Sequence, residues 1–142
     1  MQTQCLPPAP CTTGDQDCYC FRYQAAKEAG FSAVEVAFPY DVDKAVLVET
    51  KERLGLEQVL LNTKVGPTLG HGARKGEEDQ FMESIKTSLE YCSALKVKRL
   101  HIMAGYKQEG VAKEEAMEVF RNNLRSELIR QTECIGRVAS GK

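Results

Sequence analysis

The sequence predicts an α/β fold built on a parallel sheet. Three segments repeat one pattern, an amphipathic helix, a tight turn and a short apolar strand, with the strands at residues 33–38, 57–62 and 98–103. Because a helix separates each strand from the next, the connections are crossovers, and strands joined by crossovers lie parallel and adjacent. The chain of 142 residues has the length of one domain.

The first repeat begins with a helix that we expect to end just before Gly30. Glycine suits the left-handed conformation that follows a helix C-terminus. Residues 33–38 (AVEVAF) are rich in β-branched and aromatic side chains, and Pro39 closes this run. They therefore predict the first strand of the repeat.

The second repeat has Asp41 and Asp43 as candidate N-caps, and Gly55 is expected to end its helix. The next strand is predicted over residues 57–62. The loop at 63–76 is polar and rich in glycine, so we expect it to be mobile. It could fold over a small anion, although most such loops are solvated connections.

The third repeat consists of a helix over residues 77–94 and a strand over 98–103, and a last helix begins near Val111. Apolar residues recur at helical spacing along the 77–94 segment. They are Phe81, Ile85, Leu89 and Cys92.

Charge and hydropathy exclude two classes of partner. Nineteen basic and twenty acidic residues give a net charge of −1, whereas nucleic-acid-binding domains usually have a basic face. The apolar runs are far shorter than the ~20 residues of a membrane span. The N-terminus fits neither a secretory signal nor a transit peptide. We therefore expect a cytoplasmic protein with no nucleic-acid partner and no membrane partner.

The first 21 residues differ from the rest. They hold four of the six cysteines and three prolines, and proline blocks helix and central-strand pairing. Cys18 and Cys20 are one residue too close for the usual zinc-binding pair. We interpret this segment as a disordered tail that carries thiols, with a thiol or metal site as the alternative.

Three polar residues lie within or at the ends of the predicted strands, and they are candidate substrate-binding residues. They are Glu35, Asn62 and His101. In parallel sheets and barrels, ligands bind beyond the C-terminal ends of the strands. Strand alternation places Glu35 opposite Val34 and Val36, facing a barrel interior or a sheet surface.

Each candidate also has a structural interpretation. Glu35 could form a buried ion pair with His101. Asn62 can donate and accept, which suits a small hydroxylated or carbonyl ligand, but it could also be a turn residue that ends the strand. His101 could act as an acid or base near neutral pH, or it could be a core histidine with its hydrogen bonds satisfied.

Residues 25–41 (AAKEAGFSAVEVAFPYD) resemble hydroxypyruvate isomerases of the xylose-isomerase-like superfamily. The resemblance continues through 59–63 (VLLNT), 99–105 (RLHIMAG) and 119–125 (VFRNNLR). It implies a (β/α)₈ TIM barrel that interconverts hydroxypyruvate and 2-hydroxy-3-oxopropanoate. The chain would supply about three parallel strands with flanking helices, a partial barrel over residues 22–130 between divergent segments at 1–21 and 131–142.

The reaction needs a base, an acid and a cation or donors for the enediolate. The resemblance implies that a pair of glutamates and a divalent metal such as Mg²⁺ supply them from later strands. No catalytic residue, metal ligand or cofactor is therefore assigned to this chain. We expect a truncated isomerase, inactive alone, whose substrate in the full-length enzyme is a small hydroxy-oxo acid. The alternative is a non-catalytic fragment that binds the full-length enzyme, itself or another partner through exposed sheet edges.

Overall fold

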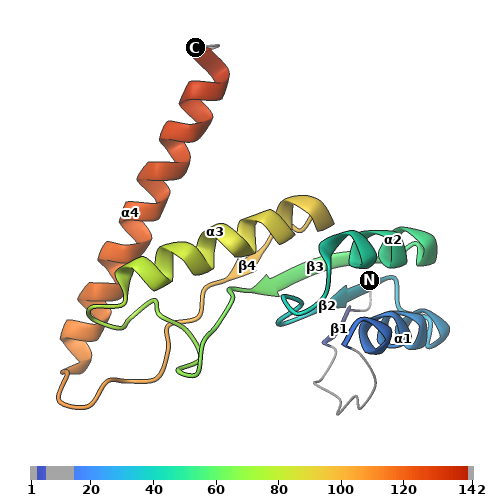
Figure 1. Ribbon diagram of the computed structural model, residues 1–142, viewed down its shortest axis with the longest axis horizontal. Helices are drawn as coiled ribbons and strands as arrows, with labels where there is room; N and C mark the ends of the chain where they lie inside the picture. The colour runs from blue at the N-terminus through green and yellow to red at the C-terminus, as the bar shows by residue number, and fades with distance from the viewer. Residues whose placement is uncertain (1–2, 6–14, 141–142) are drawn as a thin grey trace. The chain divides into compact units, whose positions relative to one another are not determined.

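The computed structural model describes the backbone of residues 3–5 and 15–140 and the side chains of residues 19–126. Its contacts form two units, residues 1–64 with 85–101, and residues 65–84 with 102–142. Helices and strands alternate along the chain (Figure 1). Their order is β1 (Thr3–Cys5), α1 (Asp15–Glu28), β2 (Ala33–Glu35), α2 (Lys44–Leu54), β3 (Glu57–Asn62), α3 (Glu78–Leu95), β4 (Leu100–His101) and α4 (Lys113–Ser140).

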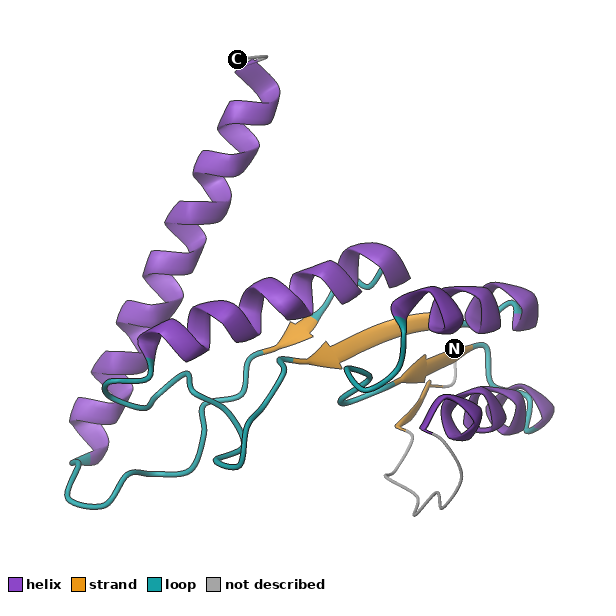
Figure 2. Cartoon of the chain, viewed as in Figure 1, coloured by secondary structure: helices purple, strands orange, loops and turns teal. Residues whose placement is uncertain are grey.

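The first unit contains a parallel sheet with the strand order β1-β2-β3-β4 (Figure 2). Successive strands are neighbours, as crossover connections require, so the predicted α/β class is confirmed. The strand β1 was not predicted. It pairs Thr3 with Ala33, and the prolines that argued against pairing, Pro7, Pro8 and Pro10, come after it and lie outside the described residues.

The core of the first unit lies between this sheet and the helices α1, α2 and the C-terminal part of α3. Its buried residues come from all three helices and from β2 and β3, so these helices cover one face of the sheet. The residues of this cluster are Tyr23, Ala26, Val34, Val36, Val42, Leu47, Leu54, Leu56, Leu61, Cys92, Leu95 and Val97.

The helix ends follow the predicted signals. The Asp43 carboxylate accepts from the Ala45 amide at 2.7 Å and caps α2. Gly55 follows α2 with φ of 61°, and Gly30 follows α1 with φ of 86°. Lys51 is an unusual residue of α2, because its charged neighbours Glu52 and Arg53 are exposed. It is buried, and its Nζ donates to the Leu95 carbonyl at 3.0 Å.

A bulge changes the register between β2 and β3. Val34 pairs with Gln58, whereas Glu35 pairs with Leu60, so Val59 is an additional residue on β3. The strand β2 ends at Glu35, three residues earlier than predicted.

The bulge sets which β3 side chains face the helices. Gln58 faces α1, because its Oε1 accepts from the Tyr23 hydroxyl at 2.5 Å. Leu61 also belongs to the core on the helix side. Because side chains alternate along a strand, Asn62 then points to the opposite face of the sheet.

The second unit contains the loop after β3, which was expected to be mobile but makes several backbone hydrogen bonds. Its backbone pairs with the segment after β4: the Ala73 amide donates to the Ala104 carbonyl at 2.8 Å, and the Tyr106 amide donates to the Thr68 carbonyl at 2.7 Å. A Cβ on Gly70 would lie 2.3 Å from the Met103 oxygen. The glycine therefore allows close approach of two backbones.

Side chains hold this loop as well. The Glu77 carboxylate contacts His71 Nδ1 and Arg74 Nε, each at 2.7 Å. The hydrogen bond with His71, together with Arg74, lowers the pKa of Glu77 below its usual value of 4.5. In α4, the Asn123 amide donates to the Gly72 carbonyl at 2.9 Å and fixes the helix to the loop. Among the residues that the structure describes, no helix has the length and hydropathy needed to cross a membrane.

Candidate functional site

Asn62 and His101 form a polar pair at the C-terminal ends of β3 and β4. The strand register places them opposite each other, and the atoms His101 Nδ1 and Asn62 Oδ1 are 3.1 Å apart. An amide oxygen only accepts, so Nδ1 carries the proton and donates. In a neutral imidazole this leaves Nε2 as an acceptor. His101 is exposed and Asn62 is half-buried, so a small molecule can reach both.

The backbone beneath this pair is held by a partly buried hydroxyl network. The Tyr40 hydroxyl donates to the Asn62 carbonyl and lies 3.0 Å from Ser88 Oγ. Ser88 Oγ also accepts from the Lys64 amide at 2.9 Å. The network therefore fixes β3 at Asn62 and just after it, where the strand ends.

Tyr40 is suited to this role by its surroundings. Its ring packs edge-on against Tyr91, with the ring centroids 5.1 Å apart. Burial raises the pKa of Tyr40 to about 12, which the hydrogen bond with Ser88 partly offsets. The hydroxyl therefore stays protonated, and able to donate, over the physiological pH range.

Glu35 lies deeper on the same face of the sheet. It pairs with Leu60, which precedes Asn62 by two residues, or about 6.6 Å along the strand. Its neighbours Val34 and Val36 are buried on the helix side, and Glu35 itself is half-buried. Glu35 therefore lies on the face of the sheet opposite the helices, as strand alternation predicts.

The structural alternatives are resolved differently for the three residues. Within the part of the chain whose side chains are described, Glu35 forms no ion pair, so the proposed pairing with His101 is wrong. His101 is not a core residue, because it is exposed. Asn62 ends its strand and also bonds to His101 through its side chain.

Residues 23–131 match the family described as "Xylose isomerase-like TIM barrel". The chain belongs to this family. Its parallel sheet with helices on one face is therefore part of a TIM-barrel fold, with β2, β3 and β4 as the three predicted strands.

Two relatives within this family indicate a chemistry. A human protein provisionally named hydroxypyruvate isomerase is 38% identical over 112 residues, which cover 73% of this chain and 40% of the relative. A 2-oxo-tetronate isomerase of Haemophilus influenzae is 36% identical over 108 residues, covering 73% of this chain and 42% of the relative. The chain thus spans about two-fifths of the length of these relatives.

A solved structure of the same fold carries a different name. The crystal structure of AP endonuclease, family 2, from Brucella melitensis is 35% identical, with a TM-score of 0.71 over 75% of this chain and 43% of that one. The family fold therefore carries proteins with different named activities, and the function has to be argued from the site.

The family resemblance implies a divalent metal in the complete barrel. Among residues 19–126, no three side chains of the types His, Cys, Asp and Glu come together as a metal site. The thiol or metal hypothesis rested on four cysteines. The side chains of Cys5, Cys11 and Cys18 lie outside the described residues, and Cys20 is a free cysteine whose Sγ is 3.1 Å from Thr50 Oγ1.

Sequence reasoning missed Tyr40 and Ser88. Tyr40 follows the first predicted strand directly, within the FPYD segment that carried the family resemblance, and this was the available signal. Ser88 gave none, because a serine within an amphipathic helix is an ordinary residue. Its contact with Tyr40 joins residues 48 positions apart.

Proposed function

We propose that this chain supplies one wall of the substrate site of an isomerase that acts on short hydroxy-oxo acids. The reaction we propose is the interconversion of hydroxypyruvate and 2-hydroxy-3-oxopropanoate, with Glu35, Asn62 and His101 in contact with the substrate. The observation that carries the proposal is the Asn62–His101 pair, at the strand ends where ligands of parallel α/β folds bind.

The pair presents complementary groups to such a substrate. His101 Nε2 is free to accept a hydrogen bond, because Nδ1 is used on Asn62. The Asn62 amide group keeps its two N–H donors, because its oxygen takes the bond from His101. An α-hydroxy carbonyl compound offers a hydroxyl donor beside a carbonyl acceptor, and both match this arrangement.

Glu35 would orient the substrate against this wall. Its carboxylate lies on the same face of the sheet as Asn62. Glu35 pairs with Leu60, two residues before Asn62 on β3. Like charges repel, so a substrate acid would place its carboxylate away from Glu35 and turn a hydroxyl towards it. In this orientation the reacting carbons lie near the Asn62–His101 pair.

We further propose that the 142 residues alone do not turn over substrate. Isomerisation moves a proton between adjacent carbons and needs an acid–base pair and stabilisation of the enediolate. The chain spans 40% of the human relative, and losing one acid–base group costs ~10²–10⁴ in rate. Addition of the remaining segment of a relative should restore activity.

Two observations favour isomerase chemistry over the alternatives. The chain has no excess of positive charge, with a net charge of −1, which a DNA-cleaving enzyme would use to hold phosphates. The relatives that match over most of this chain include both hydroxypyruvate and 2-oxo-tetronate isomerases by name. A binding role through the edge strands β1 and β4 remains the second candidate, because each pairs with one neighbour within the described sheet.

The test measures binding of hydroxypyruvate to the chain by ligand-observed NMR. We expect saturable binding that is weakened at least fivefold by Asn62→Ala. The matched control is Asn122→Ala, because Asn122 is exposed on α4 and its side chain forms no hydrogen bond among residues 19–126. Equal binding by both variants would contradict the proposed wall.

A further inference from the structure

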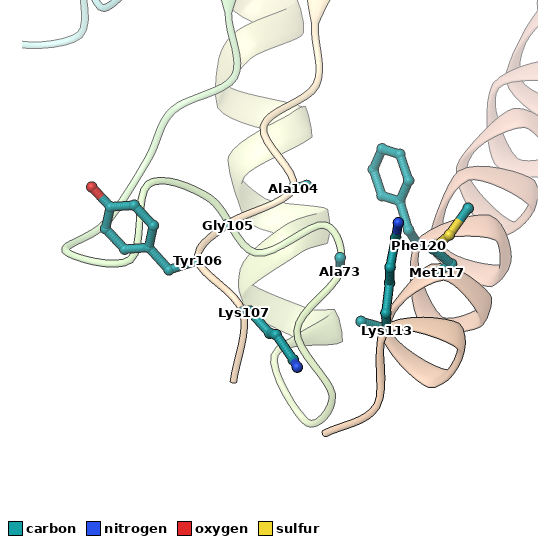
Figure 3. A pocket seen from close by; sticks show the side chains of 9 residues that line it. Ala73, Ala104, Gly105, Tyr106, Lys107, Lys113, Met117 and Phe120 are labelled. Carbon is teal, nitrogen blue, oxygen red and sulfur yellow. The ribbon is translucent and has the colours of Figure 1, made fainter. Parts of the chain in front are cut away.

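The second unit contains a pocket outside the proposed substrate wall. It lies between the loop that follows β4 and the N-terminal part of α4, and its volume is about 230 Å³ (Figure 3). Ala73 and Ala104 line the loop side, and Met117 and Phe120 line the helix side. The lining is therefore mostly apolar.

The walls of this pocket are held in place before any ligand binds. The Ala73 amide donates to the Ala104 carbonyl at 2.8 Å. Arg74 Nη1 donates to the Tyr106 carbonyl at 2.7 Å. On the other side, the Asn123 amide fixes α4 to the Gly72 carbonyl. A preformed pocket loses little conformational entropy on binding.

The volume indicates the size of the ligand. An engineered apolar cavity of ~150 Å³ binds benzene, so a pocket of about 230 Å³ has room for one aromatic ring and a short substituent. Phe120 in the wall offers a ring for edge-to-face packing. A bare phosphate would bury no apolar surface here and gains nothing from such a lining.

The charge of the pocket indicates the substituent. Lys107 comes from the loop wall and Lys113 from the helix wall, and neither forms an ion pair or hydrogen bond among the described side chains. Elsewhere in this unit, Lys75 pairs with Glu115 at 2.8 Å. Glu115 is thus already occupied, and the two lysines leave the pocket rim positive.

We propose that this pocket binds a small aromatic carboxylate, with the ring between the helix side, at Met117 and Phe120, and the loop side of the pocket, and with the carboxylate at Lys107 and Lys113. The proposal is independent of the isomerase function, because it uses only residues of the second unit. A single-ring acid with a one-carbon spacer, such as phenylacetate, has the required size and charge.

The experiment compares phenylacetate with its neutral analogue phenylacetamide on the full chain, by ¹⁵N-resolved NMR titration at low salt. We expect saturable shifts of the amides of Ala104 and Met117, with phenylacetamide at least tenfold weaker. An exposed ion pair contributes little free energy, so Lys107→Gln and Lys113→Gln should each weaken the binding of phenylacetate about two- to fivefold. Raising the salt concentration should weaken it further.

Two control variants separate the effect of the lysine charges on binding from the effect of the apolar lining. Lys98→Gln, at an exposed lysine of the first unit, should leave binding unchanged. Met117→Gln should weaken both ligands alike. Equal affinity for the acid and the amide, shifts elsewhere than in this pocket, or no saturation at millimolar concentration would each overturn the proposal.

Discussion

Replacing Tyr40 with phenylalanine removes a single oxygen atom and tests the network that holds the end of β3. The hydroxyl has two partners, the Asn62 carbonyl and Ser88 Oγ. A hydrogen bond contributes a net 0.5–1.5 kcal/mol, and a buried group that loses its partner adds a desolvation cost. We therefore expect Tyr40→Phe to lower the free energy of unfolding by about 1–2 kcal/mol.

Two other tyrosines provide reference values for the loss of stability on Tyr→Phe substitution. Tyr91 makes one hydrogen bond, to the Val42 carbonyl at 2.8 Å, so Tyr91→Phe should cost about half as much as Tyr40→Phe. Tyr106 is 60% exposed, and Tyr106→Phe should change stability by less than about 0.5 kcal/mol. The chain has no tryptophan, so urea unfolding is followed by circular dichroism at 222 nm.

The pH dependence gives a second readout of the same group. The pKa of Tyr40 is raised from 10 to about 12 by burial, so the folded state holds this proton more tightly than the unfolded state. The contribution of the protonated Tyr40 hydroxyl to the free energy of unfolding is complete below pH 10 and is lost as the pH rises towards 12. Tyr40→Phe should flatten this decline. A variant as stable as Tyr106→Phe, with an unchanged alkaline profile, would refute the reasoning.

Three further predictions concern stability. The pKa of Glu77 is lowered by His71 and Arg74, so its contribution is present above pH 4.5 and is lost as the pH falls through the lower folded value; acid titrations should show a shallower loss in Glu77→Gln than in the wild type or in Glu109→Gln. Lys51→Met should cost about 1.5–3 kcal/mol in urea unfolding, because the Leu95 carbonyl loses a charged donor, whereas Arg53→Met on the exposed side should cost less than about 0.5 kcal/mol. Gly70→Ala should lower the melting temperature far more than Gly76→Ala, since both have positive φ but only the Cβ at Gly70 meets backbone; equal shifts would show that φ strain alone decides.

The fold was predictable where single residues mark the ends of elements. Gly30, Asp43 and Gly55 act through local backbone geometry, so their effect can be inferred without tertiary structure. The loop after β3 was not predictable. Its glycines indicate mobility by composition, but Gly70 instead permits contact with a segment more than thirty residues later, and nothing local marks that partner.

The candidate site was predictable in its residue types and only partly in its geometry. Alternation along β2 placed Glu35 on the face opposite the helices, because the additional residue of the bulge lies on β3 and not on β2. The bond between Asn62 and His101 depends on the register of β4 against β3 and on the bulge at Val59. A bulge arises from the pairing of two strands, and the sequence of one strand does not reveal it.

The central claim is that Asn62 and His101 form a wall that contacts a hydroxy-oxo acid, and the imidazole of His101 tests it most directly. The chain has two histidines, and His71 serves as the internal control because Glu77 engages its Nδ1. Long-range ¹H–¹⁵N spectra distinguish the two ring nitrogens. The account predicts that His101 is protonated on Nδ1 and that hydroxypyruvate shifts its Nε2 while leaving His71 unchanged. A proton on Nε2 in the free chain, or equal responses of both histidines, would contradict it.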